Sequence, residues 1–165
     1  MPLLGLCLGM QSLATAIARQ GPGWTTAEMA EAAPDAERHS VVPIETGEHR
    51  LGRLEIRAVP GSRLAALLSA ETAIAYNHRH RLAPALHEAL ASAGVRVAAF
   101  GGAPDQGIAD AIEAEDGYCI GVQGHPELSS RPGRPHPLFR ALVAEARTLA
   151  AIRSSQQEGK DGSRA

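Results

Sequence analysis

The spacing of apolar positions changes within the first ten residues of the chain. Leu3, Leu4 and Leu6 form a short apolar run, which predicts a buried strand. Directly after it, apolar residues recur at helical spacing and predict an amphipathic helix with these positions on one face: Met10, Leu13, Ala14, Ile17 and Ala18. A Gly-Pro-Gly stretch at 21–23 ends that helix. The chain therefore begins with a strand that turns straight into a helix.

Apolar spacing also predicts the later elements. Residues 24–52 are polar and interrupted by Pro and Gly, so we expect irregular structure there. Ser62 is the expected N-cap of a short helix, and Pro84 and Gly94 bound another. The expected elements are strands at 53–58, 72–76, 95–100, 107–114 and 118–123, and helices at 64–68, 85–93 and 138–149. Residues 1–152 are expected to form one domain, and 153–165 a disordered tail.

Composition narrows the class of protein. The 165 residues are 44% apolar, which suits a single globular domain, and only 3% aromatic. With 16 basic and 18 acidic residues, the net charge of −2 indicates neither a nucleic-acid nor a membrane surface. Two cysteines form no disulfide framework, and no apolar run approaches a membrane span. We expect a cytoplasmic protein.

Cys7 lies at the corner between the first strand and the first helix, with Gly5 and Gly9 on either side. This is the pattern of a nucleophile elbow, in which a sharp turn exposes the reactive side chain. The positive end of the helix dipole favours thiolate, and the N–H of Leu8 would be free to stabilise an oxyanion. A small buried core residue is the alternative, and this segment alone does not decide between them.

His125-Pro126-Glu127 follows the last expected strand. A residue before proline favours extended conformations, in which side chains two positions apart point to the same side. Glu127 could therefore orient the imidazole of His125, as a thiol nucleophile requires of its base. By itself, such a pair at a strand end is more often a solvated surface feature. Together with the elbow, it predicts a Cys-His-Glu triad.

Several segments resemble the class I glutamine amidotransferases, and most closely the glutaminase domains of CTP synthases. The resemblance spans roughly residues 2–146, and its motifs occur in the family's order. They are the Gly-Leu-Cys-Leu-Gly-Met-Gln run at 5–11, the fainter Arg-Leu-Gly at 50–52, the His-Arg-His-Arg run at 78–81, the Gly-Val-Gln-Gly-His-Pro-Glu run at 121–127, Ser-Arg-Pro at 130–132, and Arg-Pro-His-Pro-Leu-Phe at 134–139.

The resemblance implies an α/β fold, a flavodoxin-like sheet with flanking helices, and hydrolysis of L-glutamine. Cys7 would attack the side-chain amide to form a thioester, and the Leu8 N–H would stabilise the oxyanion. His125 would act as base and acid, with Glu127 orienting it. The ammonia would pass to a synthetase domain or subunit that aminates UTP, so ATP and Mg would belong there and this domain needs no cofactor.

Three further residues acquire substrate-binding roles from the same resemblance. Gln11 and Glu28 would hold the α-ammonium end of glutamine, and Arg81 would pair with its α-carboxylate. Without the resemblance, Gln11 could be solvated, and Arg81 could belong to an exposed basic loop. The spacing from Cys7 to Glu28 is shorter than in the family. Cys119 is expected in the core, and the absence of Cys-x2–4-Cys spacing argues against a metal site.

The sequence departs from the family at its start, where several strands and a glycine-rich loop with the second oxyanion donor would precede the nucleophile. We expect a sheet that lacks these N-terminal strands, as in a fragment. Gly124 also replaces a usual Phe beside the expected base. A catalytically impaired module that binds glutamine or docks on a partner, and a different cysteine hydrolase, remain as alternatives.

Overall fold

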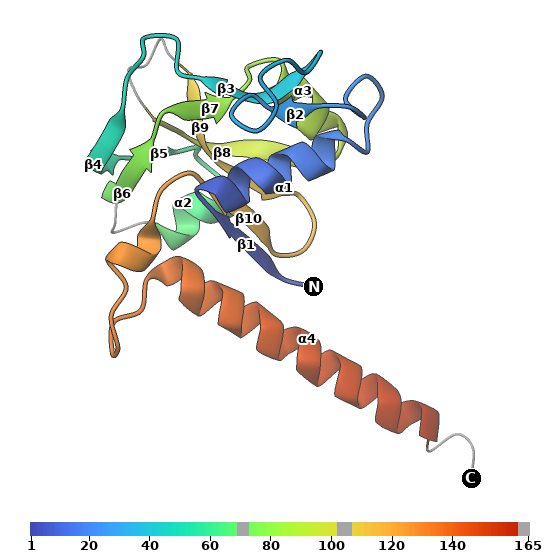
Figure 1. Ribbon diagram of the computed structural model, residues 1–165. Helices are drawn as coiled ribbons and strands as arrows, with labels where there is room; N and C mark the ends of the chain where they lie inside the picture. The colour runs from blue at the N-terminus through green and yellow to red at the C-terminus, as the bar shows by residue number, and fades with distance from the viewer. Residues whose placement is uncertain (69–72, 102–106, 162–165) are drawn as a thin grey trace.

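The computed structural model describes residues 1–68, 73–101 and 107–161 (Figure 1). Its central sheet has the strand order β1-β10-β9-β8-β5. These strands are β1 (Leu3–Leu6), β10 (Cys119–Val122), β9 (Ile108–Ala114), β8 (Val95–Gly101) and β5 (Arg57–Ala58). Two smaller sheets contain β2 (Glu28–Met29), β3 (His39–Pro43) and β7 (His80–Leu82), and β4 (Arg50–Glu55) and β6 (Ala73–His78). The helices are α1 (Leu8–Ala18), α2 (Arg63–Leu67), α3 (Leu86–Ser92), α4 (Pro137–Asp161) and the 3-10 turn η1 (Pro126–Leu128).

β1 and β10 form the parallel pair that positions the site. Their register pairs Leu3 with Cys119 and Leu6 with Val122, whereas β10, β9, β8 and β5 pair antiparallel with one another. The sequence allows α1 to pack closely on this pair because Gly5 has no side chain. A Cβ at Gly5 would lie 2.8 Å from the carbonyl oxygen of Gly9. Close contact of the helix with the strand therefore requires glycine at this position.

The core lies on both faces of the central sheet. α1 and α3 pack on one face, and α2 and the first turns of α4 pack on the other (Figure 1). One core cluster includes Met10, Ala14, Leu86, Leu90 and Ile112, and the other includes Leu64, Tyr76, Ile120, Val122 and Leu138. The core is built almost entirely from aliphatic side chains, as the low aromatic content requires.

α2 is fixed at its N-terminus by two side chains. Ser62 accepts a hydrogen bond from the Ala65 N–H at 2.9 Å, so the predicted N-cap is confirmed. The Glu113 carboxylate accepts the N–H groups of Arg63 and Leu64, each at 3.0 Å, and pairs with Arg96 at 2.6 Å. Burial opposes ionisation of Glu113, but these donors outweigh it and hold its pKa below the ordinary value.

The prediction of irregular structure over 24–52 is wrong in part. β3 pairs with β7, with Val41 opposite Leu82, and β4 begins at Arg50 and pairs with β6. Their partners lie far along the chain, so local pattern does not reveal them. The expected strand 53–58 divides at Ile56, because β4 pairs with β6 and β5 pairs with β8. Thr72, the expected start of β6, lies outside the described residues.

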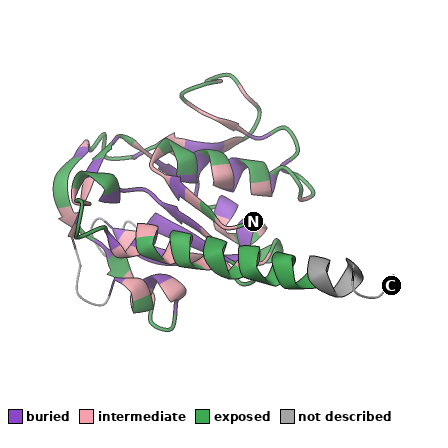
Figure 2. Ribbon diagram, turned by 90° about the horizontal axis from the view of Figure 1, so that it is seen from below, coloured by how far each residue is buried: buried purple, intermediate pink, exposed green. Residues whose placement is uncertain are grey.

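The expectation of a disordered tail from residue 153 is also wrong as far as Asp161, because α4 continues to that residue. Its first turns are anchored by buried Leu138, while residues 150–156 are exposed (Figure 2). Ala, Arg, Gln and Glu have high helix propensity, and adding residues to an anchored helix costs little. Residues 162–165 lie outside the described part of the chain.

Candidate active site

Cys7 occupies a strained corner between β1 and α1. Its φ of 49° and ψ of −111° make it the one non-glycine residue with positive φ in the described ranges. The Cys7 N–H donates to the Val122 carbonyl at 2.8 Å, and its own carbonyl accepts from Met10 and Gln11 in the first turn of α1. Such strain costs about 1–3 kcal/mol and is typical of functional sites. The elbow geometry predicted from the sequence is therefore present.

The expected base and its partner follow β10 at the same edge of the sheet, because parallel strands end side by side. His125 Nδ1 lies 2.6 Å from Glu127 Oε1, and the His125 N–H donates to the Ala75 carbonyl of β6 at 2.7 Å. The two side chains meet as expected. They do so across the 3-10 turn η1, which begins at Pro126, rather than along an extended chain.

The environment of Cys7 opposes ionisation of its thiol. Burial raises its pKa and the charge of Glu127 raises it further, while hydrogen bonds from the Leu8 N–H and the Gln123 side chain act in the opposite direction. The net direction is upward, so burial outweighs the groups around Cys7 that favour thiolate. Both donors nevertheless lower the pKa of Cys7, and the Gln123 Nε2 lies 3.7 Å from its sulfur. Leu8, the expected oxyanion donor, is one of them.

Gln11 and Gln123 form a buried pair of amides next to Cys7. Gln11 is 5% exposed and donates through Nε2 to Gln123 Oε1 at 3.0 Å. Gln123 is fully buried and donates through Nε2 to Cys7 Sγ at 3.7 Å. Gln11 therefore lies near the expected nucleophile and is not solvated. Gln123 had no predicted role, although a polar amide at the end of an apolar strand was a usable signal.

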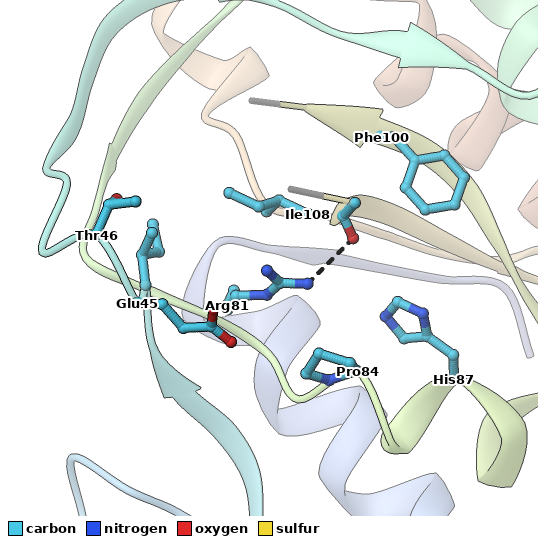
Figure 3. Close-up of a pocket in the computed structure, with 9 residues that line it drawn as sticks. Glu45, Thr46, Arg81, Pro84, His87, Phe100 and Ile108 are labelled. Atoms are coloured by element: carbon cyan, nitrogen blue, oxygen red, sulfur yellow. Dashed lines mark hydrogen bonds between the residues drawn. The ribbon is translucent and has the colours of Figure 1, made fainter. Parts of the chain in front are cut away.

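Arg81 lies on β7 and is buried, with 6% exposure. Its Nη2 donates to the Gly107 carbonyl at 3.1 Å, and it lines a cavity of about 600 Å³ with Glu45, Thr46 and His87 (Figure 3). Burial, and then the charge of Arg81, lower the pKa of His87. Neither Cys7 nor His125 lines this cavity. The placement excludes an exposed basic loop and leaves the carboxylate-binding role as a prediction.

Glu28 lies elsewhere. Its carboxylate pairs with Arg19 at 2.5 Å, and both side chains are partly exposed. Arg19 caps the C-terminal end of α1, whereas Cys7 precedes the N-terminal end of the same helix. A helix of 11 residues separates its ends by about 16 Å. The structure therefore does not bring Glu28 together with the other expected site residues.

A buried ionic network around Asp110 connects to the end of β10. Arg50 makes a bidentate ion pair with Asp110, with Nη2 to Oδ2 at 2.9 Å. The Tyr76 hydroxyl donates to the same carboxylate at 2.8 Å, and His78 Nε2 lies 3.4 Å from Arg50 Nη1. The Asp110 carbonyl accepts the N–H of Gln123 at 2.8 Å. The network therefore ties β4 and β6 to β9, and β9 to the end of β10.

The remaining chemical groups of the described residues suggest no further centre. Cys119 is half-buried on β10, and burial raises the pKa of its thiol. No group of three or more His, Cys, Asp or Glu side chains in the described ranges could hold a metal ion. Over the same ranges, no helix is both long enough and apolar enough to cross a membrane.

Comparison with known proteins agrees with this geometry. The glutamine amidotransferase class-I family model matches residues 1–144. The chain is 37% identical over 167 residues to a CTP synthase of Thermomicrobium roseum, covering 94% of this chain and 29% of the relative. It is 38% identical over 157 residues to a CTP synthase of Synechococcus sp., covering 88% of this chain and 28% of the relative. The chain thus spans less than a third of the curated relatives it matches.

A solved structure is similar in fold. The glutaminase domain of Trypanosoma brucei CTPS, with bound acivicin, superposes with a TM-score of 0.79 at 25% sequence identity. The superposition covers 89% of this chain and 60% of that one. The α/β fold expected from the sequence is confirmed.

Proposed function

This chain belongs to the class I glutamine amidotransferase family, and from that membership we propose that it hydrolyses glutamine as the glutaminase part of a CTP synthase-like enzyme. The observation that carries the proposal is the arrangement at the ends of β1 and β10. A strained cysteine at a helix N-terminus and a histidine paired with a carboxylate follow adjacent parallel strands. These are the parts that a thiol nucleophile needs.

In the proposed reaction, Cys7 Sγ attacks the carbonyl carbon of the glutamine side chain. His125 takes the thiol proton and returns it to the departing nitrogen, so that ammonia leaves and a thioester remains. The Leu8 N–H donates to the oxyanion. Water activated by His125 then hydrolyses the thioester to glutamate and restores the thiol. Glu127 holds the imidazole with Nε2 directed away from it, because Nδ1 is already paired with this carboxylate.

The matching proteins are CTP synthases, and this supports the destination that we propose for the ammonia. A synthetase domain or subunit would use it to aminate UTP, with ATP and Mg bound there. Gln11 and Arg81 are proposed to hold the two ends of the substrate. Arg81 already presents a buried guanidinium to a cavity, where it would suit a carboxylate. Glu28 has no supporting geometry.

Ammonia release from glutamine tests the proposal. Purified chain is incubated with glutamine beside Cys7→Ala, and released ammonia is measured by a coupled enzymatic assay. Release that disappears in Cys7→Ala supports the triad. A folded chain that releases no ammonia, alone or with a synthetase partner, would refute the glutaminase role. If glutamine or acivicin then raised the melting temperature of that inactive chain, the chain would be a binding module.

A further inference from the structure

We propose that Gln123 is a further catalytic residue of this site, whose side-chain N–H stabilises the Cys7 thiolate, and that Gln11 is a positioning residue that fixes the orientation of the Gln123 amide. The inference rests on the proposed function, because it concerns the same nucleophile.

The backbone holds Gln123 beside the elbow. Gln123 directly follows β10, and its N–H is held by the Asp110 carbonyl of β9 at 2.8 Å. On the other side, the preceding carbonyl of Val122 accepts the Cys7 N–H at 2.8 Å. The Gln123 side chain is completely buried. The peptide unit between Val122 and Gln123 therefore links the strand pair β1–β10 to β9.

The direction of the amide is set by its second partner. Gln11 Nε2 donates to Gln123 Oε1 at 3.0 Å, so the Gln123 oxygen is occupied as an acceptor. The nitrogen faces Cys7 Sγ at 3.7 Å. Reversing the Gln123 amide alone would place two N–H donors against each other in a buried space, and such a mismatch is costly. Gln11 acts on Cys7 only through Gln123.

The chemistry explains why a donor is useful there. When His125 removes the proton from Cys7, negative charge develops on a sulfur whose burial disfavours it. A hydrogen bond to a charged acceptor is about twice as strong as one to a neutral acceptor. The Gln123 N–H therefore contributes more to the thiolate than to the thiol. The negative charge of Glu127 acts against it, which increases the need for a fixed donor.

The alternative is that Gln123 only satisfies buried polar groups. The two roles differ in what they predict for the ionisation of Cys7. A structural amide affects unfolding and leaves the pH at which Cys7 becomes reactive unchanged. A thiolate donor shifts that pH upward when it is removed.

The experiment measures alkylation of the full 165-residue chain by iodoacetamide across a pH series, with the Cys7 and Cys119 peptides quantified by mass spectrometry. Gln123→Met keeps the length and removes the donor, and Gln123→Glu replaces it with a carboxylate. We expect the midpoint for Cys7 to rise by about 1 pH unit or more in Gln123→Met, which is a tenfold loss of thiolate at a given pH. Gln123→Glu should raise it further.

Two controls isolate the effect. Cys119 is an internal reference whose midpoint should stay constant, and Gln20→Glu adds the same charge at an exposed position on the far end of α1. Gln11→Met should shift the Cys7 midpoint in the same direction by less. If circular dichroism shows that the Gln123 variants do not fold, Gln11→Met tests the inference in their place. An unchanged Cys7 midpoint in folded Gln123→Met, or in Gln11→Met when only that variant folds, overturns the inference.

The assay needs no glutamine, so its failure is separable from failure of the proposed function. A shifted midpoint in a chain that releases no ammonia keeps the role of Gln123 and refutes the glutaminase role. Ammonia release with an unshifted Cys7 midpoint would support the glutaminase role and overturn the role of Gln123. If the chain is active, Gln123→Met should lower kcat with little change in KM, because the donor acts on sulfur and not on bound glutamine.

Discussion

Replacing Arg50 by Met should strongly destabilise the protein, because the substitution leaves a buried carboxylate without its partner. The side chains of Arg50 and Asp110 are 1% and 0% exposed, and the two groups are joined by two hydrogen bonds. Methionine fills a similar length without charge. The Asp110 carboxylate would keep only the Tyr76 hydroxyl as a side-chain donor in the described structure.

The loss of unfolding free energy in Arg50→Met follows from the burial of the ion pair. Removing one partner of a buried ion pair costs about 3–5 kcal/mol. With a urea m-value of about 2 kcal/mol/M for a domain of this size, the unfolding midpoint should fall by about 2 M. The total stability of a domain is about 5–15 kcal/mol, so the variant should be folded only at low urea. Losses this large are rare among single substitutions.

Urea unfolding followed by fluorescence measures the change. Trp24 is the only tryptophan, it is 8% exposed, and the Arg38 guanidinium lies 5.0 Å from its ring centroid. Arg53→Met is the matched control, because Arg53 lies on the same strand with its side chain exposed. It should change stability by less than about 1 kcal/mol.

The double variant Arg50→Met, Asp110→Asn decides whether the unpaired charge is responsible. Removing both charges should recover at least half of the loss, since replacing a whole buried pair by neutral groups is often tolerated. A single variant that loses less than about 1 kcal/mol would refute the argument. So would a double variant that is no more stable than the single one, because lost packing would then be the cause.

Three smaller predictions concern other parts of the fold. Gly5→Ala should cost about 1–3 kcal/mol in urea unfolding, because its Cβ would meet the carbonyl of Gly9 at 2.8 Å; an unchanged midpoint would contradict the tight packing of α1. Ser62→Ala should cost about 1 kcal/mol through loss of the N-cap, with Ser62→Thr as the retained-cap control. The depressed pKa of Glu113 stabilises the fold above the unfolded-state pKa, and this contribution is lost as pH falls through the folded-state pKa. Urea midpoints between about pH 7 and about pH 3 should therefore fall less steeply in Glu113→Gln, and parallel slopes would exclude the effect.

Local pattern was sufficient for elements that are specified by neighbouring residues. The helix after Cys7 and the cap at Ser62 depend on residues within one or two turns. The strand before Cys7 was predicted from its apolar run, although its partner β10 is distant in sequence. β3 was missed because its stability comes from pairing with β7, about forty residues away. The helix beyond residue 152 was missed because polar composition was taken as disorder, although the same residues have high helix propensity.

The site was predictable where a motif combined chemistry with geometry. Cys7, His125 and Glu127 were identified from the elbow, the His-Pro-Glu run and the family resemblance together, and the structure places them on adjacent strand ends. The environment of the thiol was not predictable, because burial and the contact with Gln123 depend on β10, which is distant in sequence.

The pairing of β1 with β10 also determines when the site can exist during synthesis. The Cys7 N–H is held by Val122, and the sulfur contacts a side chain 116 residues later in the chain. At about 5–20 residues per second, a ribosome needs on the order of 10 s to make that stretch. During this interval Cys7 lacks the Val122 and Gln123 contacts that hold it in the folded chain. Cys7 is therefore translated well before the segment that encloses it.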